Sequence, residues 1–370
     1  MTAGRPLVVL TALLFAGAPI QAQVDQHWRE WKVIWRDHTD IAADYDPAED
    51  AWTLTVDRGD FEDPTDAALD PLETILLVPH HTRREVPPDI PPNFSFLGEE
   101  GDSYYRLPFG VEENVLDLGF NAERFSSDFD HFADDRVHFE LVDFRGKDDF
   151  VLYRGSEPTI FMDTRAENPP FGERSEPLGG HSHHTWFFRE RGIYILFLET
   201  YAELAADGSI TRSEEPVPLY FLVDPEPVHW WRLDTFRTEA KEPHAALTAD
   251  AGGDGRPNLL AYALDYSPFE PADRYLPFPE IVERDESRHL SLVFRAPEGS
   301  AGLDDRSDLI YRVQVSTDLE TWEDLENDGL ESLEQVAPDA DGTRRFRAVD
   351  PIPLGVSEHR FIRLEVEMVE

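Results

Sequence analysis

Short segments in which apolar and polar residues alternate recur along most of this 370-residue chain, and they constrain the fold more than any other feature. A side-chain period of two residues is typical of β-strands, whose successive side chains point to opposite faces. About nine such segments precede Asp224, mostly at the spacing of about 8–12 residues that is typical of β-sandwiches. No part of this region has a convincing helical period. We therefore predict an all-β fold, with a sandwich of about nine strands over residues 23–224.

Alternating segments return after Arg288, in HLSLVFR, LIYRVQVSTDLETW, RRFRAVD and RFIRLEVEM. They predict a smaller C-terminal sandwich over residues 288–370, of the fibronectin or immunoglobulin-like kind. Residues 225–287 are predicted to be a linker. Within this linker a helical pattern covers Pro257–Leu264, where the proline favours the first turn of a short helix. The chain should therefore hold two β domains.

The first residues carry the features of a secretory signal. One basic residue precedes an apolar run from Leu7 to Ala16, and Ala22 precedes Gln23. That run is too short to span a membrane, so we predict a signal peptide over residues 1–22, cleaved after Ala22. No second apolar run approaches membrane length, which predicts a soluble mature chain without a membrane span. The expected location is secreted, periplasmic or at the cell surface.

The composition excludes some classes of function and disfavours others. The chain has no cysteine, so disulfides and thiol catalysis are excluded and stability must come from core burial. Its formal net charge of −43 repels phosphate backbones and disfavours nucleic-acid binding. Such a charge favours cations, basic partners or a saline habitat. Because Asp and Glu are spread along the whole chain, a solvated acidic surface suited to salt is the favoured explanation of this charge.

The stretch Gly179–Val223 holds the densest group of histidines in the chain. Strand periodicity places His181 and His183 on one face, and it turns His184 to the other face together with Trp186. Two imidazoles that share one face of a strand are suited to hold a metal ion or a small ligand. The histidine pair is therefore the first candidate for a site.

Two hairpins are predicted around turns of polar residues. Alternation over residues 41–45 and again over 52–56 surrounds the acidic turn DPAED. The turn Arg189–Gly192 similarly predicts that the histidine-bearing strand pairs with the apolar strand Ile193–Thr200. That second strand is apolar on both faces, as expected of a strand buried between two layers.

Several segments between about Trp35 and Asp224 carry a family resemblance: DHTDIAADYD, PPNFSFLGEEGDSYYRLP, LGFNAERF, and above all GGHSHHTWFFRERGIYILFLETYAEL with DGSITRS and PLYFLVD. Together they resemble the choice-of-anchor M domain, which is related to the surface-anchored repeat of actinobacterial cell-wall proteins. The resemblance covers about half of the chain. It implies an extracytoplasmic β-sandwich found on exported proteins with varied surface anchors. Some relatives accompany the binding protein of an ABC transporter, which implies reception of a substrate.

A second resemblance concerns Gly252–Pro268 and the C-terminal segment. They are similar to a tail common in exported Verrucomicrobia-type proteins, in which GDG-x-x-N-L-x-x-Y-A-L precedes a domain that reads VQVSTDLETW and ends in RFIRL. Such tails often finish with a sorting helix. This chain finishes with RLEVEMVE instead, so surface attachment is expected to be indirect.

The first resemblance brings five residues together as motif positions of one site: His38, Asp40, Glu123, His181 and His183. Neutral imidazoles with one or two carboxylates suit a divalent metal ion, zinc above all. The spacing alone places His38 beside Asp40 on one strand face, but it does not bring these residues to the other histidines. Histidine pairs in strands also occur as hydrogen-bonded surface residues, so a purely structural role stays open.

A second cation candidate is a turn that resembles an EF-hand loop. The ligand positions one, five and nine would be Asp250, Asp254 and Asn258. Gly252 replaces the ligand expected at position three, and Ala261 stands where a bidentate glutamate is expected. We therefore expect calcium binding to be weak or absent and the turn to be structural.

The remaining signals are weaker. The basic residues around His80–Arg84 are interpreted as a solvated loop, and the pair Trp230–Trp231 as packing against a domain. No nucleophile elbow, zinc-protease helix, phosphate loop or dinucleotide fingerprint is present, so an enzyme is not predicted.

Three hypotheses on function remain. The first is an exported binding protein that receives a divalent metal ion or a small ligand, with envelope or transporter proteins as partners. The second is a non-catalytic structural or adhesion protein of the cell envelope. A hydrolase that acts on polysaccharide is the third and the weakest.

Overall fold

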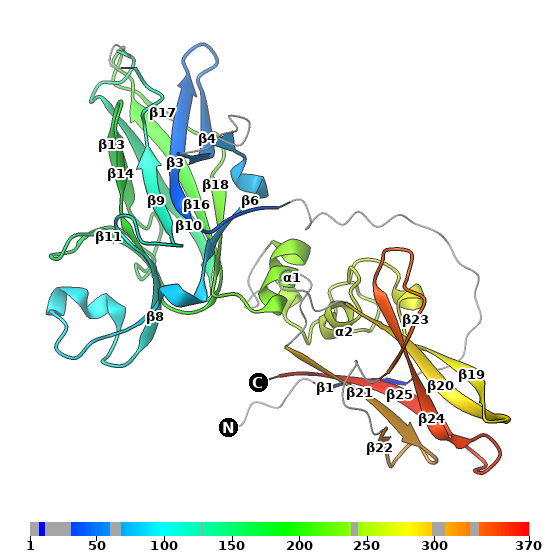
Figure 1. Cartoon of the computed structure of the whole chain (residues 1–370). Helices are drawn as coiled ribbons and strands as arrows, with labels where there is room; N and C mark the ends of the chain where they lie inside the picture. The colour runs from blue at the N-terminus through cyan, green and yellow to red at the C-terminus, as the bar shows by residue number, and fades with distance from the viewer. Residues whose placement is uncertain are drawn as a thin grey trace. The chain divides into compact units, whose positions relative to one another are not determined.

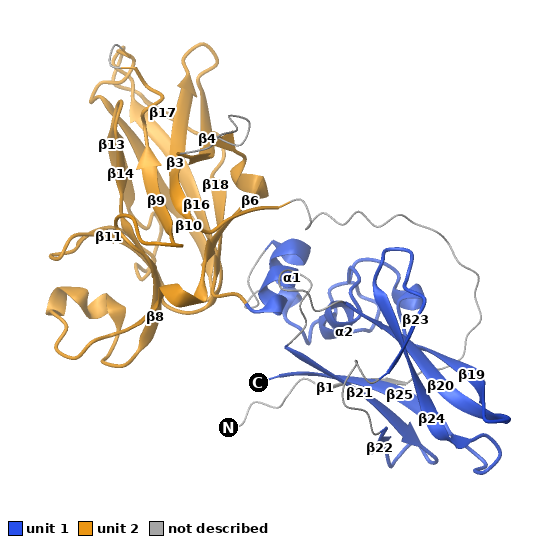
Figure 2. Ribbon diagram, in the orientation of Figure 1, with its two compact units in different colours: residues 1–25, 226–370 blue, residues 26–225 orange. Residues whose placement is uncertain are grey.

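The computed structural model describes residues 7–11, 31–59, 68–126, 129–237, 243–297, 308–325 and 333–369. These residues form many strands and only two α-helices, which confirms the all-β prediction. The chain divides into two compact units (Figure 2). Unit 2 comprises residues 26–225, and unit 1 comprises residues 226–370 together with residues 1–25. The division lies one residue beyond Asp224, where the sequence predicted the end of the first domain.

The largest sheet of unit 2 has seven strands in the order β13-β10-β16-β18-β6-β2, with β17 paired to β16. The strands are β2 (Lys32–Ile34), β6 (Thr74–Val78), β10 (Arg136–Gly146), β13 (Glu173–Pro177), β16 (Gly192–Glu203), β17 (Ile210–Arg212) and β18 (Val217–Val223). Nearly every residue of β16 and β18 is buried or half-buried. These two strands therefore read as continuous apolar runs in the sequence.

A five-stranded sheet of unit 2 has the order β12-β11-β15-β8-β7. Its strands are β7 (Arg83–Glu85), β8 (Ser103–Leu107), β11 (Phe150–Arg154), β12 (Thr159–Asp163) and β15 (Thr185–Phe188). Short 3-10 helices precede several strands: η3 (Pro71–Glu73), η4 (His80–Thr82) and η5 (Pro92–Leu97).

The other five-stranded sheet of unit 2, with the order β14-β9-β3-β4-β5, is the one that carries the candidate site. Its strands are β3 (Asp37–Asp46), β4 (Ala51–Arg58), β5 (Ala68–Leu69), β9 (Leu116–Asn121) and β14 (His181–His183). The pairing of β3 with β4 confirms the first predicted hairpin. In Figure 1, β9 lies between β3 and β14.

All three sheets of unit 2 contribute side chains to one apolar core. Phe120 of β9 stacks on Trp186 of β15 with ring centroids 5.4 Å apart, and the Trp186 indole N–H donates to the Leu118 carbonyl oxygen. Since Phe120 and Leu118 face this core, alternation turns the residues between and beside them to the outer face of the sheet. The outer face of β9 is where the candidate site lies.

Unit 1 contains two four-stranded sheets that share a second apolar core. Their strands are β1 (Leu7–Thr11), β19 (Phe278–Arg284), β20 (Ser287–Ala296), β21 (Leu309–Ser316), β22 (Glu323–Asp324), β23 (Glu334–Val336), β24 (Arg344–Pro353) and β25 (Phe361–Met368). The predicted strands of the C-terminal segment are all present as β20, β21, β24 and β25. Their likeness to a fibronectin or immunoglobulin-like sandwich stays a prediction.

The prediction of a linker over residues 225–287 is wrong. This segment belongs to unit 1 and contains α1 (Pro227–Phe236), α2 (Asn258–Ala263), η6 (Pro243–Ala245) and η7 (Ala272–Arg274). Helix α2 is the short helix that the sequence predicted, whereas α1 was missed. Val228 and Trp231, one helical turn apart, pack into the unit 1 core, and the Glu226 N–H donates to His229 Nδ1 at 2.8 Å. A histidine in the place of the usual Glu or Gln hides this helix start from a sequence search.

The second predicted hairpin is also wrong. β15 pairs with β8 and β11, whereas β16 pairs with β10 and β18, so the turn after Phe188 leads from one sheet to another. Both strands are buried on each face, and such strands carry no solvent-facing pattern that identifies their neighbours. The estimate of about nine strands is also too low. The described part of residues 23–224 holds seventeen strands, many with only two to five residues.

Most of the predicted signal peptide, residues 1–22, lies outside the described residues. The exception is β1, whose backbone pairs antiparallel with β25. Within the described part of the chain, no helix has the length and apolar character needed to cross a membrane.

Candidate metal site

Strand register assembles the candidate site on the outer face of β14, β9 and β3. β9 is the central strand and pairs antiparallel with β14 and parallel with β3. Gly119 of β9 is therefore opposite Asp40 on one side and opposite His183 on the other. One step along the same face, Asn121 is opposite His181. One step the other way, Asp117 is opposite His38, so segments far apart in the sequence meet within three rows of one sheet.

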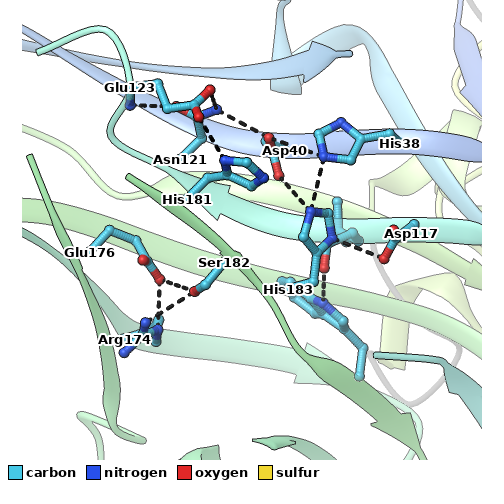
Figure 3. A network of polar contacts seen from close by, with 12 residues as sticks. His38, Asp40, Asp117, Asn121, Glu123, Arg174, Glu176, His181, Ser182 and His183 are labelled. Atoms are coloured by element: carbon cyan, nitrogen blue, oxygen red, sulfur yellow. Dashed lines mark hydrogen bonds and ion pairs between the residues drawn. The ribbon is translucent and has the colours of Figure 1, made fainter. Parts of the chain in front are cut away.

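Four predicted ligands converge: His38, Asp40, His181 and His183, called the histidine–aspartate cluster below (Figure 3). One ligand atom from each residue lies within 4.8 Å of the others. The Nε2 atoms of His38 and His183 are 3.0 Å apart, and Asp40 carboxylate oxygens lie 3.8 Å and 3.7 Å from them. Such spacing allows a single ion to contact all four side chains after small shifts.

Gly119 makes this approach of strands possible. A Cβ atom at position 119 would lie 2.5 Å from Asp40 Oδ1 and 2.8 Å from the Ser182 carbonyl oxygen. Any other residue would therefore displace the Asp40 carboxylate or push β14 away. The close approach of the strands thus requires a glycine at this position of LDLGFN, which the sequence alone did not reveal.

Asp40 is the buried member of the cluster, with 3% of its surface exposed. Its Oδ2 accepts a hydrogen bond from the Asn121 side-chain amide at 3.1 Å. Its Oδ1 is buried and has no hydrogen-bond partner among the described residues. A buried carboxylate oxygen without a hydrogen-bond partner costs free energy, and a cation held by this oxygen and the three imidazoles could offset that cost.

Two further carboxylates contact the Nδ1 atoms of two of the histidines. Glu123 Oε1 lies 2.7 Å from His181 Nδ1, and Asp117 Oδ1 lies 2.9 Å from His183 Nδ1. Because a carboxylate only accepts hydrogen bonds, the contact with Glu123 assigns the proton of His181 to Nδ1 and leaves its Nε2 lone pair available for a ligand. The contact between Asp117 and His183 is a close ion-pair distance without hydrogen-bond geometry. Carboxylate–histidine pairs of this kind orient the imidazoles of metal sites.

This arrangement changes the predicted ligand set. Glu123, predicted as a ligand, lies outside the histidine–aspartate cluster and instead holds His181. The sequence analysis missed Asp117 altogether. A signal was present, because Asp117 stands two residues before Gly119 in LDLGFN and therefore shares the outer face of β9.

The pKa shifts agree with these contacts. The hydrogen bond from His181 holds the pKa of Glu123 below its ordinary value. Burial alone would lower the pKa of His183, but the Asp117 and Asp40 carboxylates outweigh it and raise the pKa. In both cases a neighbouring side chain favours the charged form of the group.

On the core side of β14, a buried polar group fixes the strand between its two histidines. The Ser182 hydroxyl contacts the Glu176 carboxylate and accepts a hydrogen bond from Arg174 Nη2 at 3.0 Å (Figure 3). Arg174 Nε in turn lies 2.7 Å from Glu176 Oε1. Glu176 is almost fully buried, and this burial raises its pKa. The group holds β14 in the register that presents the imidazoles.

His184 has a different role from its neighbours. Its ring is fully buried and packs edge-on against Phe161 and Phe120. Burial lowers the pKa of His184 to about 3, so the ring is neutral at ordinary pH. The prediction that His184 faces away from the histidine pair is thus confirmed.

The second cation candidate has its side chains engaged by protein groups. Asp250 accepts hydrogen bonds from the backbone N–H groups of Asp254 and Gly255 at 3.1 Å and 2.7 Å. Asp254 Oδ2 lies 2.7 Å from Arg256 Nη1. Asn258 is buried and donates to two backbone carbonyl oxygens at 2.8 Å. These contacts agree with a structural turn.

The two departures from the EF-hand pattern also have physical reasons. A Cβ atom at Gly252 would lie 2.1 Å from the Pro268 carbonyl oxygen, so position three has no room for a ligand side chain. Ala261, at the position of the expected glutamate, belongs to the unit 1 core.

Comparison with known proteins adds no relative: no protein-family model matches the chain, and no curated protein matches it either. What the site can do is therefore argued from its own geometry.

Proposed function

We propose that this chain is an exported binding protein of the cell surface or periplasm, and that it receives a divalent metal ion at the histidine–aspartate cluster. The observation that carries the proposal is the convergence of three imidazoles on Asp40, whose buried Oδ1 has no other partner in the described chain. The resemblance to the choice-of-anchor M domain and the signal-like N-terminus support the exported location. The role is binding without catalysis.

Zinc is the leading candidate because the ligand set suits it. Imidazole nitrogens and a carboxylate oxygen are zinc ligands, with Zn–N distances of about 2.0–2.1 Å. In a tetrahedral site these distances put two nitrogens about 3.3 Å apart. The Nε2 atoms of His38 and His183, 3.0 Å apart, would need to separate by only a few tenths of an ångström.

The cluster is accessible from solvent on one side. The side chains of His38 and His181 are 34% and 36% exposed, whereas Asp40 and His183 are largely buried. An ion can therefore reach the buried ligands past two exposed imidazoles. A small ligand that coordinates the metal could approach along the same route.

The experiment is metal analysis and calorimetry on the purified full chain, before and after stripping with a chelator. We expect one zinc ion per chain, and we expect the double variant His181→Ala with His183→Ala to abolish binding. His131→Ala is the matched control, because His131 is an exposed histidine of the same unit outside the cluster. Circular dichroism should show that all variants fold.

The opposite result would favour the alternative of a structural or adhesion protein. In that case no metal copurifies, stripped protein binds no zinc, and the double variant and His131→Ala behave alike.

A further inference from the structure

A second group of charged side chains surrounds an open hollow of about 500 Å³ in unit 2, within the size range of small-molecule sites. It includes part of the basic segment that the sequence suggested to be a solvated loop. The side chains come from η4, β7, β8 and the turn between β15 and β16. The residues used below are His80, Arg83, Ser103, Tyr105, Arg189 and Arg191.

One buried carboxylate fixes three of these side chains. Asp224 Oδ2 lies 3.0 Å from His80 Nδ1 and accepts hydrogen bonds from the Tyr105 hydroxyl at 2.7 Å and from Arg191 Nη2 at 2.9 Å. The Asp224 side chain is only 11% exposed and the Tyr105 side chain is buried, whereas the side chains of His80 and Arg191 are 72% and 40% exposed. The wall of the hollow is therefore organised before any ligand arrives.

The acidic side chains at the hollow each have a cationic neighbour. Asp224 is held as described, Asp102 accepts a hydrogen bond from Arg189 at 2.9 Å, and the Glu190 carboxylate lies 3.6 Å from Lys147 Nζ. Arg83 differs, because its guanidinium contacts the Ser103 hydroxyl and no carboxylate of the described chain lies within ion-pair distance. Arg83 is thus a guanidinium at the hollow that forms no ion pair with a carboxylate of the described chain.

We propose that this hollow, called the arginine pocket below, binds the oxyanion group of a small ligand, either a phosphate or a carboxylate, with Arg83 as the main contact. A guanidinium presents paired N–H donors that match the oxygens of both groups. The chain as a whole carries a net charge of −43, which repels anions at long range. An anion can bind only where donors are concentrated locally, and the arginine pocket is such a place.

The test is calorimetry on the metal-stripped full chain, with inorganic phosphate as the probe for one source and glucuronate as the probe for the other. We expect one of the two probes to bind at a single site per chain. Arg83→Gln should weaken that binding by at least about tenfold, because it removes a charge-assisted bidentate contact. Arg83→Lys, which keeps the charge but loses the planar fork, should weaken it less.

Arg84→Gln is the matched control. Arg84 is the next residue of β7, points to the opposite face and contacts Glu112 at 3.3 Å, so it changes the net charge equally without touching the pocket. The double variant His181→Ala with His183→Ala should bind the probe normally, which separates this pocket from the proposed metal site. Absence of binding by either probe would overturn the proposal, as would equal weakening by Arg83→Gln and Arg84→Gln or loss of binding in the double histidine variant.

Discussion

The histidine–aspartate cluster of unit 2 and the Asp250 turn of unit 1 both have the acidic residues of a cation site, but they use them in opposite ways. In the turn, the oxygens of Asp250 accept hydrogen bonds from the backbone of the turn itself. In the cluster, Asp40 Oδ1 is buried without a partner while imidazole nitrogens gather around it. The difference suggests a criterion for candidate metal sites: polar atoms that the fold leaves unsatisfied, rather than the number of carboxylates.

The variant that tests this comparison most directly is Asp40→Asn. We expect zinc affinity to fall at least about 100-fold, beyond the usual effect of groups that only support a ligand. We also expect the metal-free variant to be at least as stable as the wild type, because a buried charge with an unsatisfied oxygen is replaced by a neutral amide. Zinc competition titrations and chemical denaturation of the stripped protein measure the two effects.

Asp44→Asn is the control for this variant, since Asp44 lies on the same face of β3 but is exposed. It should change neither quantity. If Asp40→Asn instead binds zinc normally and unfolds more easily, Asp40 is a structural residue and the contrast with Asp250 disappears.

A smaller loss of zinc affinity is expected when the carboxylates that contact the histidine Nδ1 atoms, Glu123 and Asp117, are replaced. Glu123→Gln and Asp117→Asn keep an oxygen that can accept from Nδ1 but remove its charge, so each should weaken zinc binding by about 10–100-fold. Glu113→Gln, at an exposed residue just before β9, should leave zinc binding unchanged. Equal affinities of all three variants in the competition titration would show that these carboxylates do not orient the cluster.

Local pattern in the sequence was sufficient for the all-β class, for the longer strands and for the faces of the key side chains, but not for the many short strands. The alternation in DHTDIAADYD and GGHSHH put His38 with Asp40 and His181 with His183, and the structure keeps both pairings on one sheet face. What the pattern could not supply was the partner of each strand. β3 and β9 pair in parallel across many residues of intervening chain, and such pairing leaves no local mark.

The same limit explains the errors. The turn after Phe188 was read as a hairpin because short polar turns between strands commonly form hairpins, yet here the chain changes sheets. Asp117 was overlooked because the residue that it contacts, His183, lies on a strand distant in the sequence. His181 and His183 were nominated from their spacing, but His38, Asp40 and Glu123 were joined to them only through a family resemblance, because neither charge nor composition separates these carboxylates from the other acidic residues.

The smallest expected effect belongs to the turn. Asp250→Ala removes the acceptor for two backbone N–H groups, so we expect a loss of about 1 kcal/mol in the free energy of unfolding, or about 2–4 °C in melting temperature. Asp273→Ala is the control, because Asp273 is an exposed carboxylate of the same unit with only a 3.4 Å contact to Arg256 and should have almost no effect. Millimolar calcium should shift the melting temperature of neither variant nor of the wild type, since the oxygens of Asp250 already serve the backbone. A calcium-dependent rise in the wild type that Asp250→Ala removes would make the turn a cation site, and unsatisfied atoms would no longer distinguish the two regions.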